Sequence, residues 1–353
     1  MCYAPQEFSL EGHFSFIKTR EIGNMSLKFD EIHTQKKQSL LEEMMRSVNY
    51  EIHKIDVGMN KKQTACPICK STKISLFAKK YGFNMDRCSN CDLIFCNPYP
   101  TDNQVSYYYN SEMKKFENEF FMESFQQRVQ IFLPRIEIIK SFCTSGKLLD
   151  IGSSIGIFVE ALKQSAHGFD VNCCDISKDA CEKLSHLYPD VEIINADYRE
   201  LKTQNTFDIV TMWDTVEHIV DQHELFCSVN NILNEDGLFF FSTPNTNSFE
   251  WIISDTEHVQ LLPPGHVNLM NIKNILILLE QHSFDLKGTF TLNSSLDVDY
   301  VIKQEQQNLI ASSRLGVFLK LKLEDEQFRK QFETLLCNEK LAGNIVVAAQ
   351  KRR

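Results

Sequence analysis

The sequence predicts an α/β chain with a doubly wound parallel sheet, preceded by a small metal-binding module. From residue 146 onward, short apolar strand patterns alternate with amphipathic helix patterns, which is typical of a parallel sheet covered on both faces. Before residue 100, two Cys-x2-Cys pairs enclose eighteen residues, a spacing inside the window for a tetrahedral zinc site. Together, these two patterns set the expected architecture.

Composition excludes several classes of protein. The chain has 353 residues, enough for two or three domains, and a hydrophobic fraction of 43%, which is typical of globular proteins. It contains no apolar run long enough for a membrane span and no secretory signal pattern, so we expect a cytoplasmic protein. The net charge of −10 argues against nucleic acid as the main partner and favours a small-molecule substrate.

Four consecutive parts are expected along the chain. They are a helical extension (1–60), a zinc ribbon (61–100), a helical linker or cap (101–145) and the α/β domain (146–353). Within the first part, residues 29–55 read as an amphipathic helix that packs on the domain or forms a homodimer surface.

The linker carries an aromatic stripe at helical spacing. Its members are Phe121, Phe125, Val129, Phe132, Ile136 and Ile139. Steps of three and four place them on one helix face, so we expect core packing. Pro134 is expected to kink or break this helix.

The cysteine quartet is the strongest local signal. Its members are Cys66, Cys69, Cys88 and Cys91. Because all four ligand positions would be sulfur, no position is left for water or substrate, and the zinc should be structural. Ribbons often have glycine after each pair; here Lys70 and Asp92 stand there, and lysine tolerates a left-handed turn less well than aspartate. Residues 61–91 also carry seven basic side chains and one acid, more simply a solvated face than a phosphate-binding surface.

The α/β domain is expected to alternate between strands and helices. Strands are expected at 147–152, 169–175, 191–197, 207–213, 237–244 and 343–350, and helices at 156–165, 178–188, 221–234 and 271–283. A further helical stretch is expected at about 300–340.

A nucleotide-binding turn follows the first strand. In "LLDIGSSIG", Asp150 ends the strand, Gly152 opens the turn and Gly156 begins the helix, so backbone amides would approach a ligand. Alone, this turn is a weak signal. Acids at the ends of later strands strengthen it, because ligands in such sheets bind beyond the carboxyl ends of the strands. These acids are Asp175, Asp197 and Asp214, and Trp213 stands beside Asp214 after the fourth strand.

The motif order "LLDIGSSIG", "CCDIS", "NADY", "FDIVTMWDTVEHI", "DGLFFFSTPN", "PPGHVNL" and "GNIVVAAQK" resembles class I S-adenosylmethionine-dependent methyltransferases. With the ribbon before it, the chain resembles a group from bacterial polysaccharide, deoxysugar and secondary-metabolite pathways. The resemblance implies a Rossmann-like seven-stranded sheet with an antiparallel last strand, and makes 294–341 a helical insertion. It implies that Gly152 and Gly156 approach the methionine part, Asp175 the ribose and Asp197 the adenine.

Two departures qualify the resemblance. Ser154 replaces the middle glycine of the family's G-x-G-x-G and adds a Cβ where the backbone is tight, which bears on affinity more than on the fold. We keep Ser154 among the expected cofactor-binding residues. The sugar C-methyltransferases that carry a ribbon have a further C-terminal domain, and here the core strand is the last element, which disfavours C-methylation.

Candidate catalytic residues follow the fourth and fifth strands. Glu217, His218 and His266 are expected near the methyl acceptor, where a histidine could be the general base or could only shape the loop. The same three residues could instead hold a divalent metal, although Asp214 stands where metal-dependent relatives have glutamate.

Three functions stay open at this level. The leading one is O- or N-methylation of a sugar, nucleotide-sugar or related metabolite by in-line transfer. The second is methylation of RNA held by the basic ribbon. The third is a non-catalytic methyltransferase-like binding protein, for which Ser154 is the sequence support.

Overall fold

The computed structural model describes residues 35–201, 206–292, 298–302 and 314–353. The first described helix, α2 (Gln35–Ile52), lies inside the amphipathic helix expected at 29–55, whose beginning falls outside the described residues. Part of the helical insertion expected at 294–341 also falls outside them. Within the described ranges, no helix is long and apolar enough to cross a membrane.

A seven-stranded sheet lies at the centre of the α/β domain, in the order β10-β11-β8-β7-β4-β5-β6. Its strands are β4 (Ser145–Ile151), β5 (Gly168–Asp175), β6 (Glu192–Asn195), β7 (Phe207–Met212), β8 (Leu233–Pro244), β10 (Phe284–Leu292) and β11 (Asn344–Lys351). Strands β4 to β8 pair parallel, and β11 pairs antiparallel with both β8 and β10. The predicted fold and its antiparallel last strand are confirmed. The strand order reverses between β4 and β7, where a ligand crevice is expected in such sheets.

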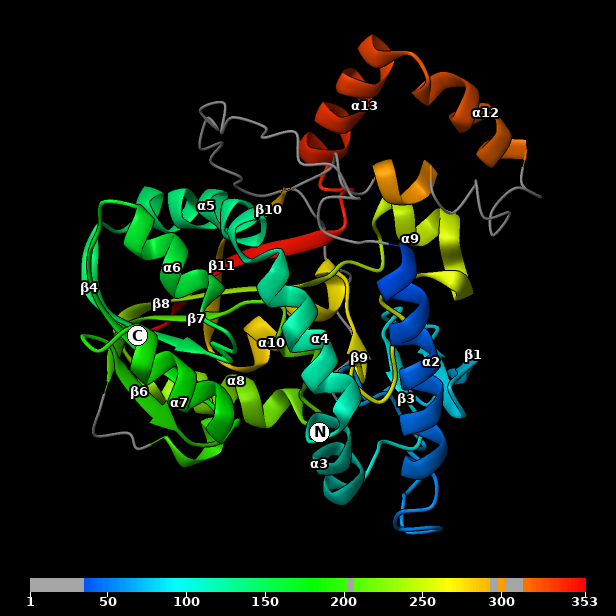
Figure 1. Ribbon diagram of the computed structural model, residues 1–353, viewed down its shortest axis with the longest axis horizontal. Coiled ribbons are helices and arrows are strands. Elements are labelled where there is room, and N and C mark those ends of the chain that lie inside the picture. Colours follow the sequence, from blue (N-terminus) through cyan, green and yellow to red (C-terminus); the bar gives the residue numbers. More distant parts are fainter. Residues whose placement is uncertain (1–34, 202–205, 293–297, 303–313) are drawn as a thin grey trace, which may run out of the picture.

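Helices cover both faces of this sheet (Figure 1). One face packs against α5 (Phe125–Phe142), α6 (Ile157–Gln164) and α7 (Lys178–Leu187), and the other against α8 (Gln222–Ile232) and α10 (Ile272–Gln281). Successive strand side chains point to opposite faces, so Leu148 packs with α5 and α6 while Leu149 packs with α8 and α10. Helices α6, α7, α8 and α10 agree with the sequence prediction to within two residues at each end.

The expected ribbon folds as a second, smaller sheet. Its strands are β1 (Ile74–Lys80), β2 (Phe83–Cys88), β3 (Ile94–Cys96) and β9 (Asn268–Leu269), in the order β1-β2-β3-β9. Strand β9 comes from the α/β domain, so this sheet crosses the boundary expected at residue 100. Both Lys70 and Asp92 have a positive φ, of 60° and 59°, so the lysine adopts the left-handed turn that its residue type disfavours.

The linker forms α3 (Asp102–Tyr109), α4 (Glu112–Glu123) and α5. The aromatic stripe read as one helix is therefore split, with Ser124 between α4 and α5, because a pattern of apolar spacing continues across a one-residue interruption. Pro134 lies inside α5, which runs on to Phe142, so of the expected kink or break, the break was wrong and the kink stays a prediction. Helix α2 packs against α3 and α4.

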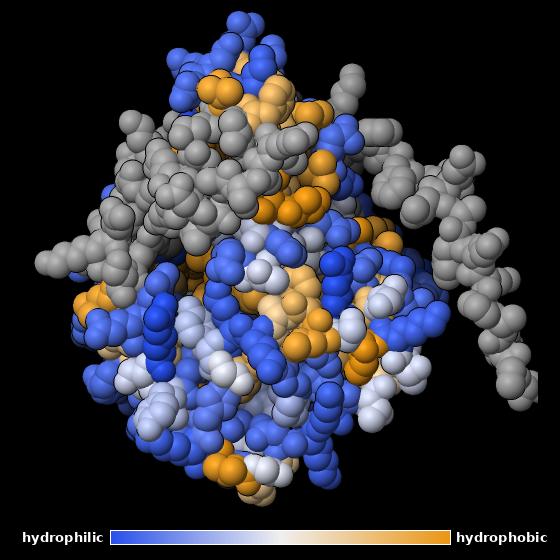
Figure 2. Space-filling view, turned by 90° about the vertical axis from the view of Figure 1, so that its right-hand side faces the viewer, coloured by the Kyte–Doolittle hydropathy of each residue, from blue (hydrophilic) through white to orange (hydrophobic). Residues whose placement is uncertain are grey.

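Helices α12 (Arg314–Leu323) and α13 (Glu326–Asn338) lie at the top of the view in Figure 1, and α9 (Phe249–Ser254) lies below them. The helical stretch expected before the last strand is thus present where the structure describes it. Figure 2 shows the side of the molecule that carries α2 and β1, where hydrophilic residues are mixed with separate apolar patches.

Candidate active site

The turn after β4 has a backbone conformation that favours glycine. Gly152 and Gly156 have φ of 80° and 83°, and a Cβ on Gly152 would lie 2.6 Å from Oγ1 of Thr215. Ser154 also has a positive φ, of 48°. The serine therefore occupies a backbone conformation that suits glycine, which explains why the family has glycine at this position.

Two acids lie beside this turn. Asp150 is 2% exposed, and its Oδ1 accepts a 2.7 Å hydrogen bond from Thr211; burial raises its pKa to about 7. Asp175, at the end of β5, accepts 2.8 Å hydrogen bonds from the backbone N–H groups of Ser154 and Ser177. The turn and the next strand end are therefore held together.

The third acid, Asp197, follows β6 and caps the short 3-10 helix η1 (Tyr198–Glu200). Burial would raise the pKa of Asp197, but hydrogen bonds from Arg199, with Nη2 to Oδ2 at 2.7 Å, outweigh that effect and lower it. In this arrangement the carboxylate is already engaged by its neighbour. Binding of an adenine amine by Asp197 stays a prediction.

Trp213 and Asp214 directly follow β7, which pairs with β4. Oδ1 of Asp214 accepts hydrogen bonds from Ser242 (2.7 Å) and Asn344 (2.6 Å), while Oδ2 lies 3.4 Å from Nη2 of Arg135. Asp214 thus joins β7 to β8, β11 and α5. Trp213 is 6% exposed.

Glu217, His218 and His266 converge, although the two histidines are far apart in the sequence. One ligand atom from each lies within 4.8 Å of the other two. We call these three residues the acceptor triad. Nδ1 of His218 lies 2.8 Å from the carbonyl of Gly265, and Nδ1 of His266 lies 2.8 Å from that of Gln260. Because a carbonyl only accepts, both Nδ1 atoms donate, and each imidazole keeps the lone pair of Nε2 for another partner.

The charges of the acceptor triad follow from its burial. Burial and then the nearby Asp214 raise the pKa of Glu217 well above its usual range. Burial and then the other histidine lower the pKa of His218, and burial lowers that of His266 to about 4. Glu217 is 1% exposed, and its Oε2 has no hydrogen-bond partner among the described residues. A polar ligand, water or cation would satisfy this oxygen.

The four ribbon cysteines also converge. Their sulfur atoms lie within 4.8 Å of one another, with 3.6 Å for the pairs Cys66–Cys91 and Cys69–Cys88. Sulfur atoms around tetrahedral zinc are separated by about 3.8 Å, as follows from a Zn–S distance of about 2.3 Å. The geometry of the quartet fits a zinc ion, and the described cysteines form no disulfide.

Sequence reasoning missed two residues that the linker helices bring to this site. Arg135, on α5, is 3% exposed and contacts Asp214, and the ring of Tyr109, on α3, lies 6.2 Å from that of His218. Tyr109 gave no signal in the sequence. Arg135 could have been found, because a charged side chain inside the apolar run "IFLPRIEII" is unusual unless it has a partner.

Comparison with known proteins agrees with this geometry. Residues 122–287 match the family model of a methyltransferase domain. The chain contains a class I S-adenosylmethionine-dependent methyltransferase domain. The matched residues include strands β4 to β8 of the seven-stranded sheet, the turn at Gly152 and all three residues of the acceptor triad.

The methyltransferase domain is similar to proteins named ubiquinone biosynthesis O-methyltransferase. The one from Colwellia psychrerythraea is 26% identical over 179 residues, covering 44% of this chain and 72% of the relative. The one from Bradyrhizobium diazoefficiens is 28% identical over 186 residues, covering 46% of this chain and 72% of the relative. Among solved structures, an S-adenosylmethionine-dependent methyltransferase from Mesorhizobium loti matches 62% of this chain and 96% of its own, at 16% identity and a TM-score of 0.41.

Proposed function

We propose that this protein transfers the methyl group of S-adenosylmethionine to a hydroxyl oxygen of a small-molecule acceptor, with the acceptor triad facing the acceptor. The convergence of Glu217, His218 and His266 beside the end of β7 carries the proposal. The names of the O-methyltransferase relatives support transfer to oxygen. The acceptor class that the sequence favours is a sugar, a nucleotide-sugar or a related metabolite, and a catechol-like quinone precursor is the alternative, in line with the ubiquinone biosynthesis named for the relatives.

The bound cofactor would supply an electrophilic methyl group on a sulfonium. The chain's own residues would then place the acceptor oxygen in line with the C–S bond, which breaks as the C–O bond forms. Nε2 of His218 or His266, which holds a free lone pair in the tautomers described above, would take the hydroxyl proton. The turn at Gly152 and the carboxylate of Asp175 would hold the cofactor.

A divalent cation in the acceptor triad is a second candidate. Two Nε2 lone pairs and a buried carboxyl whose Oε2 has no partner among the described residues form an electron-rich cluster that suits a cation. The cation would orient neighbouring hydroxyls of the acceptor. Binding of Mn²⁺ by the chelator-treated protein, read by electron paramagnetic resonance and lost in His266→Ala, would distinguish it from a histidine base.

We also propose that the ribbon cysteines hold one structural zinc ion, on the sulfur geometry. Three cationic side chains of the ribbon already have protein partners: Arg87 pairs with Asp92 at 3.2 Å, Lys80 with Glu257 at 3.6 Å, and Lys70 donates to the carbonyl of Pro67. This disfavours the RNA alternative.

The function is tested with S-adenosylmethionine labelled in its methyl group. Purified protein is incubated with a nucleotide-sugar and, separately, with 3,4-dihydroxybenzoate, and products are examined by mass spectrometry. We expect a methyl ether of one acceptor, and loss of its formation in Glu217→Gln and His266→Ala while cofactor binding by calorimetry persists. Label found only on amines, or variants as active as the parent protein, would overturn the assignment.

A further inference from the structure

One segment of the methyltransferase domain touches both the acceptor triad and the ribbon. We call residues 265–274 the linking segment. On the triad side, its Val267 N–H donates to the carbonyl of Glu217 (2.9 Å), and its Gly265 carbonyl holds the ring of His218. On the ribbon side, its Val267 carbonyl accepts from the N–H of Cys96 (2.9 Å). His266 lies within this segment.

Strand β9, also in the linking segment, is fixed from two directions. It pairs antiparallel with β3, with Leu269 opposite Ile94 and Asn268 opposite Phe95. The side chain of Asn268 accepts a 2.5 Å hydrogen bond from the hydroxyl of Tyr99 and donates to the carbonyl of Ile219 at 2.8 Å. The backbone next to His266 is therefore held between the ribbon sheet and the loop after β7.

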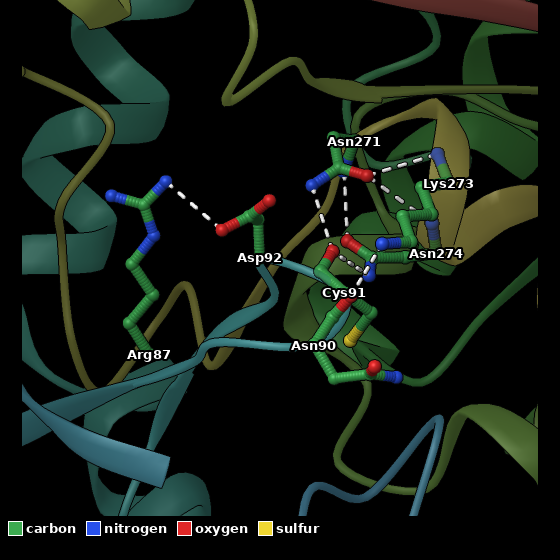
Figure 3. Close-up of polar contacts among 7 residues, drawn as sticks. All are labelled: Arg87, Asn90, Cys91, Asp92, Asn271, Lys273 and Asn274. Carbon is green, nitrogen blue, oxygen red and sulfur yellow. Dashed lines mark hydrogen bonds and ion pairs between the residues drawn. The ribbon is translucent and has the colours of Figure 1, made fainter. Parts of the chain in front are cut away.

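A pair of amides then joins the linking segment to a zinc-ligand residue (Figure 3). The side chains of Asn271 and Asn274 both donate to the carbonyl of Cys91, at 3.2 Å and 2.8 Å. Both asparagines are at most 1% exposed, so neither amide has water as a ready substitute. Lys273, between them, donates to the carbonyl of Asn90.

The same asparagines also begin helix α10. Asn271 is its N-cap and forms a capping box with Asn274. Each side chain thus uses its oxygen for the helix and its nitrogen for the ribbon. A loss of the ribbon contact can therefore be separated from a loss of the cap by substitution.

The apolar cores of the two parts are continuous. Cys66, Cys88 and Cys91 belong to the same buried cluster as Phe226 of α8 and Leu278 of α10. An independently moving module would not share a core with the catalytic domain. The ribbon is instead packed as part of it.

We propose that Asn271 and Asn274 are positioning residues that couple the ribbon to the acceptor triad, so that the folded ribbon sets the place of His266. This inference rests on the proposed function only for the statement that the triad faces the acceptor. Among the described residues, the cofactor turn at Gly152 has no hydrogen bond to the linking segment: its backbone bonds to β5, and it approaches Thr215. The coupling therefore acts on the acceptor side and leaves cofactor binding unchanged.

The first test is the double variant Asn271→Ser/Asn274→Ala. Serine keeps an N-cap acceptor while both donors to Cys91 are lost; Asn274→Ala also removes the oxygen that accepts from the N–H of residue 271, a loss confined to the first turn of α10. Two lost hydrogen bonds of ordinary strength correspond to roughly tenfold in an equilibrium constant. We expect amide hydrogen exchange in residues 265–270 to become about tenfold faster, with unchanged exchange in 150–156 and unchanged affinity for S-adenosylmethionine.

A matched control is Asn230→Ala. Asn230 also donates from its side chain to a backbone carbonyl, that of His282 at 3.0 Å, and it joins α8 to the end of α10 without touching the ribbon. Exchange in 265–270 should not change in this variant. If the double variant does not fold, Asn271→Ser alone removes the longer of the two hydrogen bonds to Cys91. It should then give a smaller increase of exchange in residues 265–270.

The second test removes zinc from the parent protein with a chelator, with zinc content followed by mass spectrometry. We expect faster amide hydrogen exchange in residues 265–270 and 217–220. We also expect the KM for the acceptor that the protein methylates, either a nucleotide-sugar or 3,4-dihydroxybenzoate, to rise about tenfold with a smaller change in kcat. Faster exchange confined to residues 66–96, or an equal increase of exchange in residues 150–156, would overturn the coupling. If neither probe is methylated, the proposed function fails, while the exchange result still decides the coupling.

Discussion

The backbone N–H of Ser154 donates a 2.8 Å hydrogen bond to Oδ2 of Asp175, which ties the tightest part of the cofactor turn to the end of the neighbouring strand. The second oxygen of Asp175 accepts from the N–H of Ser177. We expect the same carboxylate to accept hydrogen bonds from the hydroxyl groups of a bound ribose.

Asp175→Ala is expected to weaken the binding of S-adenosylmethionine. Loss of hydrogen bonds to a charged group costs about 1.5 to 3 kcal/mol, or roughly 10- to 150-fold in the dissociation constant. Titration calorimetry measures this dissociation constant. Asp179→Ala is the control, because Asp179 is an exposed acid of α7 that pairs with Lys183. Equal affinities for the two variants would remove the assigned role of Asp175.

Ser154→Gly is expected to stabilise the fold slightly and to change cofactor affinity little. Glycine adopts the φ of 48° without the roughly 1 kcal/mol strain of a Cβ, although it loses more backbone entropy on folding. Urea unfolding and calorimetry measure the two effects. A large gain in affinity would instead indicate a turn that has lost its function, as the non-catalytic alternative requires.

Cys88→Ser is expected to lower the bound zinc from one ion per chain and to reduce the melting temperature. Three thiolates bind zinc more weakly than four, and metal binding contributes directly to the folding of small metal-bound modules. Elemental mass spectrometry and thermal unfolding give the two readouts. Cys227→Ser should behave like the parent protein, because Cys227 is exposed and far from the quartet in the sequence.

Asp150→Asn is expected to change how stability depends on pH. The pKa of Asp150 is raised by burial to about 7, above an unfolded value of about 3.9. Its carboxyl therefore contributes stability that is fully present below about pH 4 and is lost as the pH rises through 7. Between pH 5.5 and 8, the parent protein should lose about 2 kcal/mol relative to the variant. Urea unfolding at several pH values, without cofactor, measures this difference. A constant difference between the two proteins would contradict it.

Asp214→Asn is expected to destabilise the protein more than Arg135→Met does. The Arg135 side chain is 4% exposed, so a buried cation without its counter-charge costs about 3 kcal/mol. The Asp214 side chain is 37% exposed and keeps its hydrogen bonds from Ser242 and Asn344 when Arg135 is removed. Urea unfolding of both variants and of the double variant gives the coupling energy. Additive costs would show that the pair does not interact.

Local patterns were enough to predict the fold and the parts of the site that lie at strand ends. Alternating strand and helix patterns predicted the parallel sheet, because the periods of 2 and 3.6 residues follow from backbone geometry. Paired cysteines predicted the quartet, since ligand spacing within each pair is a property of a few residues. The turn at Gly152 was predicted for the same reason.

Contacts between distant segments came only from the tertiary structure. Arg135 and Asp214 are 79 residues apart, and Cys91 and Asn274 are 183 apart. No spacing rule connects such residues, because their meeting depends on how helices and the small sheet pack against the large one. The sequence by itself determined the sheet, the cofactor turn, the cysteine quartet and the candidates of the acceptor triad. Tertiary packing decided that the ribbon shares its sheet and its core with the catalytic domain, because burying the apolar surface of both parts in one core removes more of it from water.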